Sequence, residues 1–238
     1  MASRPAFLTH DCRAPLVRIE TFDFKWHPGL ALIQKMKSVE ELHSAISKKY
    51  PGKKILEVST KSKDVYGKFL SAFNLTFITK RYPKSISVET AFQSSKVFDN
   101  GGPYIDLLEK TSLEAKKDLR IKNSGKLTHF LFFQEHWELT PLTAFYDWLY
   151  INALNQHKNL VEYVTQYDCF TDIEFNPEKS INCQAHSVAL FVSLYKKDAL
   201  KDALISKANY LNTIANFNIP ERLHTTEKRF SLVQGSLL

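Results

Sequence analysis

The chain has 238 residues, of which 44% are hydrophobic and 24% charged, so its composition excludes a disordered protein and allows a sizeable core. The formal net charge of +7 is compatible with a polyanionic partner, although the lysines are dispersed along the chain in pairs. With only 7 glycines and neither a Gly-x-Gly-x-x-Gly nor a Walker-type run, the sequence excludes the common dinucleotide-binding and phosphate-loop classes.

Cysteine usage and hydropathy limit the cofactors and the compartment. Cys12, Cys169 and Cys183 are odd in number and widely spaced, so we expect neither a disulfide framework nor a cysteine zinc site. No cluster of metal ligands stands out in the sequence, and we expect no metal and no other cofactor. The N-terminal apolar run is too short for a signal peptide, and no run reaches the ~20 apolar residues of a membrane span. We therefore expect a cytoplasmic protein without a membrane partner.

The first half of the chain predicts an irregular arm followed by alternating helix and strand. Residues 1–30 contain several prolines, which favour irregular structure. Beyond them, apolar periodicity and turn residues predict a helix, a strand, an aromatic-rich connection and a second helix. These segments span residues 34–48, 54–60, 66–74 and 87–98, in that order.

The second half predicts mainly helices around one buried strand. Asn100-Gly101-Gly102-Pro103 breaks the preceding helix. The expected elements are helices at 112–119, 142–155, 160–167, 182–194 and 198–216, a strand at 129–133, a polar loop at 171–181 and a loose tail at 219–238. The sequence thus predicts a single helix-rich α+β domain with a small β component. We place the main domain at 31–197, with an N-terminal arm at 1–30 and a C-terminal helical extension and tail at 198–238.

The segment from Ser87 to Phe98 combines a carboxylate with an amine. Glu89 and Lys96 are seven residues apart, about two helical turns, so an uninterrupted helix would place both on one face. Ser87 is suited to cap the start of that helix. By itself, this pattern favours an ordinary surface helix with two charges.

Two other segments, residues 70–74 and 172–184, also place polar groups among apolar neighbours. Taken singly, these groups are typical turn formers and helix caps. Together with Glu89 and Lys96 they supply what is needed to break a glycosidic bond. A carboxylate can act as acid or base, a lysine can capture an aldehyde as a Schiff base, and amides and hydroxyls can hold ribose and phosphate. Because distance in sequence does not show convergence, the pattern alone leaves the function open.

The order of these motifs resembles that of the NADAR superfamily. The matching residues are Tyr66-Gly67, Leu70-Ser71-Ala72-Phe73-Asn74, then Glu89, Phe92, Gln93 and Lys96, then Trp137, Ala153-Leu154 and Asn182. Over residues 4–195 the chain is similar to the NADAR antitoxins paired with DarT-type DNA ADP-ribosyltransferase toxins. That similarity rests on Arg4-Pro5, Trp26-His27-Pro28-Gly29, Gly101-Gly102-Pro103-Tyr104, and the segments 145–150, 170–177 and 180–185. The superfamily's Trp-Gly pair after the acidic residue is replaced here by Phe175-Asn176.

This resemblance implies a function and roles for particular residues. It implies an ADP-ribosyl glycohydrolase that removes ADP-ribose from guanine bases in DNA, single-stranded or flipped out, and so opposes a cognate DarT-type toxin. We expect Lys96 to be the nucleophile, with Lys61 as its rival, Glu89 to relay protons and Asp172 to be a further catalytic group. The expected substrate-binding residues are Ser71, Phe73, Asn74, Gln93, Tyr104, Trp137, Glu174, Asn182 and Gln184.

Two other functions stay open. One is an N-glycosidase that acts on a small phosphorylated nucleotide or a riboflavin-pathway intermediate, which some NADAR relatives are. The other is a non-catalytic module that binds ADP-ribose or masks the toxin.

Overall fold

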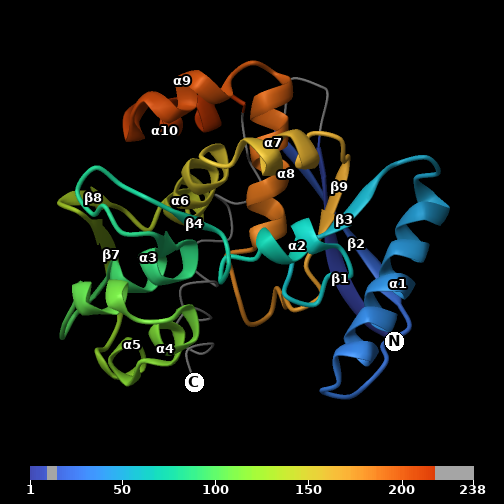
Figure 1. Ribbon diagram of the computed structural model, residues 1–238, viewed down its shortest axis with the longest axis horizontal. Coiled ribbons are helices and arrows are strands. Elements are labelled where there is room, and N and C mark those ends of the chain that lie inside the picture. Colours follow the sequence, from blue (N-terminus) through green and yellow to red (C-terminus); the bar gives the residue numbers. More distant parts are fainter. Residues whose placement is uncertain (10–14, 218–238) are drawn as a thin grey trace. The chain divides into compact units, whose positions relative to one another are not determined.

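A computed structural model describes residues 1–9 and 15–217 (Figure 1). The tail expected at 219–238 lies outside the described residues. The class is mixed α+β, as predicted, and the described chain forms two compact units, each assembled from separate segments. Unit 1 comprises Met1–Ser71, His157–Pro177 and the described part of Cys183–Ile219. Unit 2 comprises Ala72–Gln156 and Glu178–Asn182.

Unit 1 is built on a four-stranded sheet with the order β2-β1-β9-β3. The strands are β1 (Ala2–Thr9), β2 (Val17–Phe24), β3 (Ile55–Glu57) and β9 (Cys169–Thr171). β1 is antiparallel to both neighbours, whereas β3 and β9 are parallel, so these two strands end at the same edge. The predicted irregular arm is therefore wrong for residues 2–9 and 17–24, which form half of the sheet. Pro5 is tolerated because it precedes the stretch of β1 that pairs with β9.

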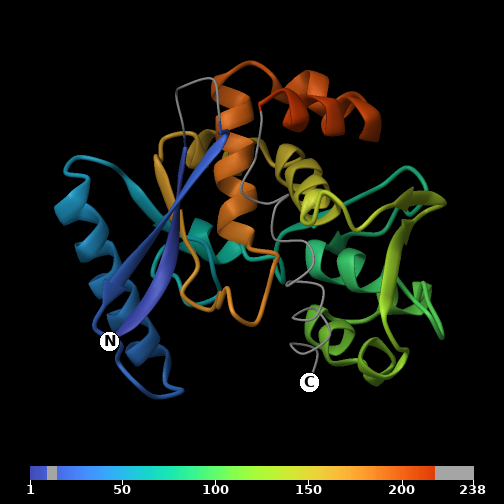
Figure 2. The same ribbon diagram turned by 180° about the vertical axis from the view of Figure 1, so that it is seen from behind.

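Helices cover both faces of this sheet (Figures 1 and 2). On one face, α1 (Leu32–Lys49) buries Leu42 and Ile46 against Leu8 and other apolar side chains of β1 and β2. Alternation along β1 turns Phe7 to the other face, where its ring lies 5.6 Å from that of His186 on α8 (Gln184–Lys196). The result is a three-layer arrangement with the sheet between α1 and α8.

The shorter helices of unit 1 are α2 (Val65–Phe69), α7 (Lys158–Val164), α9 (Leu200–Ile205) and α10 (Lys207–Asn216). The last two occupy the region predicted to be one helix. Ser206 separates them because its backbone is extended, with φ −159° and ψ 165°, and its hydroxyl accepts the Asn209 amide hydrogen to cap α10. No helix in the described ranges is long and apolar enough to span a bilayer.

Unit 2 combines two small sheets with short helices. Its strands are β4 (Thr76–Phe77) and β5 (Ile86–Ser87), which pair with each other, and β6 (Lys96–Phe98), β7 (Leu127–Phe132) and β8 (Glu135–Trp137), which form an antiparallel sheet in that order. Its helices are α3 (Val88–Ser94), the 3-10 helix η1 (Ile105–Glu109), α4 (Ser112–Lys117), α5 (Leu119–Asn123) and α6 (Ala144–Asn155).

Aromatic side chains form the core of unit 2. The Phe92 ring of α3 lies 5.3 Å from Phe130 of β7 and 6.2 Å from Phe145 of α6, and Trp137 of β8 lies 5.5 Å from Phe145. Every residue of α3 is buried. The helix that carries Glu89 is therefore packed from several sides, and the surface helix that its sequence pattern favours by itself is not observed.

Candidate functional site

The predicted helix over 87–98 ends earlier than the sequence suggested. Its start is confirmed, since the Ser87 hydroxyl accepts the Thr90 amide hydrogen at 3.0 Å, and Thr90 caps Ser87 in return. At its end, the hydroxyls of Ser94 and Ser95 both donate to the Ala91 carbonyl, at 3.1 and 2.6 Å. Such local hydrogen bonds compete with helix continuation, and Lys96 begins strand β6 instead. The prediction that Lys96 shares a helix face with Glu89 is wrong.

Glu89 nevertheless sits in a defined polar environment. It is only 5% exposed, and its amide donates to the Ala72 carbonyl at 3.0 Å. Its Oε1 accepts a hydrogen bond from Gln93 Nε2 at 2.9 Å and lies 3.7 Å from the Nζ of Lys116, on α4. The carboxylate thus faces an amide on its own helix and a cation from a neighbouring helix.

Lys96 is buried among the same groups. It is 6% exposed, and its Nζ lies 4.8 Å from the centre of the Phe92 ring. Burial lowers the pKa of Lys96 from its usual 10.5 to about 8, with Glu89 opposing the shift and Lys116 adding to it. A pKa near 8 raises the neutral, nucleophilic fraction of the amine at neutral pH by roughly two orders of magnitude. The environment therefore favours the neutral form of this amine.

Gln93 and Lys116 complete the candidate site in unit 2. Within the described part of the chain, Gln93 Oε1 is a buried acceptor without a hydrogen-bond donor. The Lys116 side chain is 54% exposed, and its Nζ lies 4.9 Å from the centre of the Phe73 ring. Lys116 appeared in the sequence only as one of several dispersed lysines. Its signal was the Thr111–Glu114 capping box, which fixes the helix that presents it.

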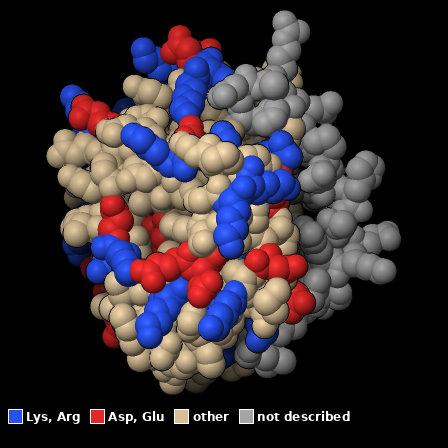
Figure 3. Space-filling view, turned by 90° about the vertical axis from the view of Figure 1, so that its right-hand side faces the viewer, with Lys and Arg blue, Asp and Glu red and all other residues tan. Residues whose placement is uncertain are grey.

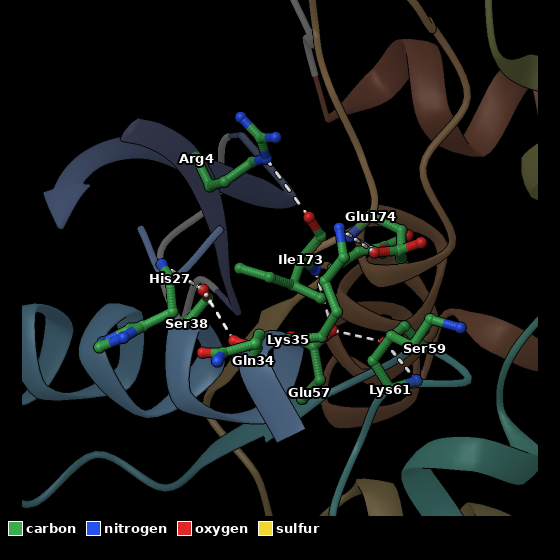
Figure 4. A network of polar contacts seen from close by, with 11 residues as sticks. Arg4, His27, Gln34, Lys35, Ser38, Glu57, Ser59, Lys61, Ile173 and Glu174 are labelled. Carbon is green, nitrogen blue, oxygen red and sulfur yellow. Dashed lines mark hydrogen bonds and ion pairs between the residues drawn. The ribbon is translucent and has the colours of Figure 1, made fainter. Parts of the chain in front are cut away.

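A second cluster of polar side chains lies at the ends of β3 and β9 in unit 1 (Figure 4). Glu57, which sequence reasoning missed, is 3% exposed at the end of β3. Its carboxylate accepts hydrogen bonds from Ser59 Oγ at 2.6 Å, Thr171 Oγ1 at 2.6 Å and the Ile173 amide at 2.8 Å. Ser59 Oγ also accepts the Lys61 amide hydrogen at 3.1 Å. One buried carboxylate thus holds the segments that carry Lys61 and Asp172.

Asp172 is a second buried carboxyl in unit 1. It is 7% exposed, and its Oδ1 accepts the Glu174 amide hydrogen at 3.0 Å. Burial raises the pKa of Asp172 well above its ordinary value, and the charge of Glu57 raises it further. The Glu174 carboxylate forms an ion pair with Lys35, whose Nζ lies 3.1 Å away. Gln184 Nε2 donates a hydrogen bond to the Val58 carbonyl at 2.7 Å.

The remaining predicted residues have mixed surroundings. Trp137 is 1% exposed within the aromatic core of unit 2, which gives it a packing role. The Tyr104 hydroxyl is hydrogen-bonded to Ser124. Ser71 is buried, Phe73 is half-buried and Asn74 is exposed.

The structure therefore sorts the predicted residues into two groups. Glu89, Gln93 and Lys96 come together in unit 2, whereas the backbone of Lys61 and the side chains of Asp172, Glu174 and Gln184 gather around the strand ends of unit 1. Asn182 belongs to unit 2, where its Oδ1 is a buried acceptor without a donor in the described ranges. No set of three or more His, Cys, Asp and Glu side chains that could hold a metal ion occurs in those ranges.

Comparison with known protein families assigns the chain to one of them. The family described as DarT1-associated NADAR antitoxin matches residues 2–224. The chain belongs to this family. The match includes strands β1 and β2 as well as α9 and α10, which the sequence placed outside the main domain. A comparison with curated proteins gave no match. Membership makes the protein an antitoxin whose counterpart is a DarT toxin, and NADAR proteins generally have glycosidase-type activity.

Proposed function

We propose that this antitoxin is an ADP-ribosyl glycohydrolase that removes ADP-ribose from guanine bases in DNA and so reverses the toxin's modification. The observation that carries the proposal is the buried Lys96, whose pKa of about 8 lies close to neutral and whose neighbours include Glu89. An amine of this kind is suited to attack the anomeric carbon of a ribose, because it is nucleophilic without needing high pH.

The chemistry can be balanced with the groups of unit 2. The neutral Lys96 Nζ attacks C1″ of the ribose, and the bond from C1″ to the exocyclic guanine nitrogen breaks. Glu89 takes a proton from the new ammonium group and delivers it to the departing nitrogen, so guanine regains its amino group. Glu89 then takes the remaining proton of the nitrogen bound to C1″ and passes it to the ring oxygen, so the sugar opens to an imine between Nζ and C1″. Water hydrolyses this imine, which releases ADP-ribose and restores the amine.

Other groups of unit 2 are suited to hold the substrate. Gln93 keeps an acceptor oxygen free for a ribose hydroxyl, and the half-exposed Lys116 is placed to contact a phosphate. Basic residues elsewhere are partly neutralised by acidic ones. Figure 3 shows a face on which Lys and Arg side chains lie among those of Asp and Glu. Ion pairs such as Lys49–Glu20, at 2.7 Å, reduce the positive potential of the surface. We therefore expect binding to depend on the modified nucleotide more than on bulk charge.

The test is to incubate the purified protein with oligonucleotides that carry ADP-ribosylated guanine and to follow free ADP-ribose. Release from the oligonucleotide, with unmodified guanine left in the strand, is the expected result. Tight binding without release would identify a binding module instead. Release only from small phosphoribosyl compounds would identify a metabolic N-glycosidase.

The covalent step has its own test. Borohydride reduces an imine to a stable secondary amine, so we expect it to trap the protein on its substrate. The adduct should be lost in Lys96→Ala and kept in Lys61→Ala. The reverse pattern would move the nucleophile to Lys61, which is the rival assignment from the sequence.

A further inference from the structure

We propose that Glu57 is a positioning residue that fixes Asp172 in place and keeps it in its protonated form, so that Asp172 can donate a proton. The inference rests on the proposed function in one respect: it takes Asp172 to act on the substrate. The contacts that support it lie entirely within unit 1.

Glu57 contacts the segment that carries Asp172 at two points. β3 and β9 run parallel, with Glu57 directly opposite Thr171, so the segment that follows each strand leaves from the same edge of the sheet. The Glu57 carboxylate accepts a hydrogen bond from the residue on each side of Asp172, namely Thr171 Oγ1 at 2.6 Å and the Ile173 amide at 2.8 Å. The backbone of Asp172 is thus held at both flanks by one side chain. Through Ser59, the same carboxylate also orders the backbone of Lys61.

Glu57 and Asp172 have no cation paired directly with them in the described ranges. Glu174 raises the pKa of both carboxyls further, although Lys35 pairs with Glu174 at 3.1 Å. Two buried carboxyls without a cation cannot both ionise at modest cost, so the pair retains a proton. Glu57 has three hydrogen-bond donors, which favour its charged form, whereas the side chain of Asp172 has only two, the amides of Glu174 and Phe175. The proton therefore belongs on Asp172.

Two consecutive hydrogen bonds lead from His43 through Thr171 to the Glu57 carboxylate, and we call them the relay. Thr171 Oγ1 lies 2.8 Å from His43 Nε2, on α1. Because Thr171 gives its single hydroxyl hydrogen to Glu57, His43 must donate to Thr171, and burial keeps His43 neutral with a pKa of about 4. Reversing the direction of both hydrogen bonds would let Glu57 hold a proton without moving any heavy atom, if His43 takes up a proton from solvent at Nδ1 as it gives up the one at Nε2. Glu57 is thus able to adjust its charge when Asp172 gives up its proton.

The decisive variant is Glu57→Gln, which preserves the shape but removes the charge. The glutamine carbonyl can accept from Ser59 and Ile173, and its amide can donate to Thr171 once the relay reverses. We expect the Asp172 pKa, measured by carboxyl-carbon NMR titration, to fall by about one pH unit or more, since its charged neighbour is gone. The limb of the pH–rate profile that coincides with the Asp172 pKa should move to lower pH by the same amount.

Two variants serve as controls. Glu174→Gln removes a nearby carboxylate that accepts no hydrogen bond from the flanks of Asp172, and it should produce a clearly smaller shift. Thr171→Val cuts the relay but leaves Glu57 charged, so the Asp172 pKa should stay high while turnover falls. Thr171→Val also provides the test if Glu57→Gln does not fold.

The NMR titration needs no substrate, so it separates this inference from the proposed function. An unchanged Asp172 pKa in folded Glu57→Gln, or a low one in folded Thr171→Val, would overturn the role of Glu57. If the wild-type protein releases no ADP-ribose but the titration shifts as expected, the proposed function fails and the coupling of the two carboxyls stands. If the wild-type protein turns over its substrate but no part of the pH–rate profile shifts together with the Asp172 pKa in Glu57→Gln, Asp172 is not a proton donor.

Discussion

The two units each bury a group that would normally be charged, and they solve this problem in different ways. In unit 2, Lys96 lies against the Phe92 ring, and burial brings its pKa down to about 8. In unit 1, Glu57 and Asp172 are both buried, the charge of Glu57 raises the pKa of Asp172, and hydrogen-bond donors surround Glu57. Burial thus favours the neutral form of the lysine in unit 2 and the protonated form of Asp172 in unit 1.

A glycine supports the main chain of each centre. A Cβ at Gly67 would collide with the Glu57 carbonyl oxygen, and one at Gly102 would collide with the Lys96 carbonyl oxygen. Both glycines lie in motifs on which the family resemblance rests. We therefore predict that units 1 and 2 contain independent polar centres. Each centre should be perturbed by substitution of its own side chains and of its own glycine.

The largest expected effect follows from removing the amine of unit 2. Lys96→Met keeps an apolar side chain of similar length, and we expect turnover of ADP-ribosylated oligonucleotide to fall by about 10³-fold or more because the nucleophile is gone. The midpoint temperature of thermal unfolding should change little or rise, because an apolar group replaces a buried amine. Turnover within tenfold of the wild type would show that the lysine of unit 2 is not the nucleophile.

Glu89→Gln tests the proton relay beside that lysine. We expect turnover to fall by roughly 10²-fold or more while substrate binding persists, because the amide cannot carry a proton. The pKa of Lys96 should also decrease, since the attraction of the carboxylate is lost. Titration of isotope-labelled lysine by NMR, alongside single-turnover rates, measures both effects, and an unchanged rate would exclude Glu89 from the mechanism.

A glycine substitution tests the support of the centre in unit 2. In Gly102→Ala, a side chain at φ +91° would press on the backbone of Lys96, and we expect a loss of about 2–4 kcal/mol in unfolding free energy. Gly52→Ala is the matched control, because Gly52 has φ +85° but open space around it. Its cost should be about 1 kcal/mol. Equal costs measured by denaturant titration would mean that the contact with Lys96 is unimportant.

The smallest expected effect concerns Lys116. Lys116→Gln removes a positive charge that helps to lower the pKa of Lys96, so that pKa should rise by a fraction of a unit. The shift is opposite in sign to that of Glu89→Gln. We also expect KM to increase severalfold if Lys116 contacts a phosphate. Lys117→Gln, at the next position of α4, is the control and should leave the Lys96 titration unchanged.

The sequence predicted local elements better than it predicted their partners. The helix over 34–48 has a strong apolar stripe, and the structure confirms it as α1. Strands β1 and β2 were missed because prolines favoured an irregular arm, whereas these segments pair with each other along their full length and β1 also pairs with β9, far along the chain. The end of α3 was missed because two serine hydroxyls and pairing with β7 overrode the helical pattern.

The candidate site was foreseen in part for a similar reason. Glu89, Gln93 and Lys96 were chosen together, and they do meet, although through a helix followed by a strand. Glu57 was overlooked because it ends a short apolar run and was read as part of an ordinary strand. A carboxylate in a strand that is otherwise apolar was the available signal, since such a group needs buried partners. Those partners, Thr171 and Ile173, lie more than a hundred residues away.

The position of β9 has a consequence for how the chain folds during synthesis. This strand lies between β1 and β3, yet it is the last of the three to be made, and nearly all of unit 2 is encoded between β3 and β9. Until residue 171 has left the ribosome, β1 and β3 lack their common neighbour, whereas the segment 72–156 is already complete. We therefore expect unit 2 to gain its structure first, and the long-range closure of the sheet to limit the rate at which the antitoxin becomes active.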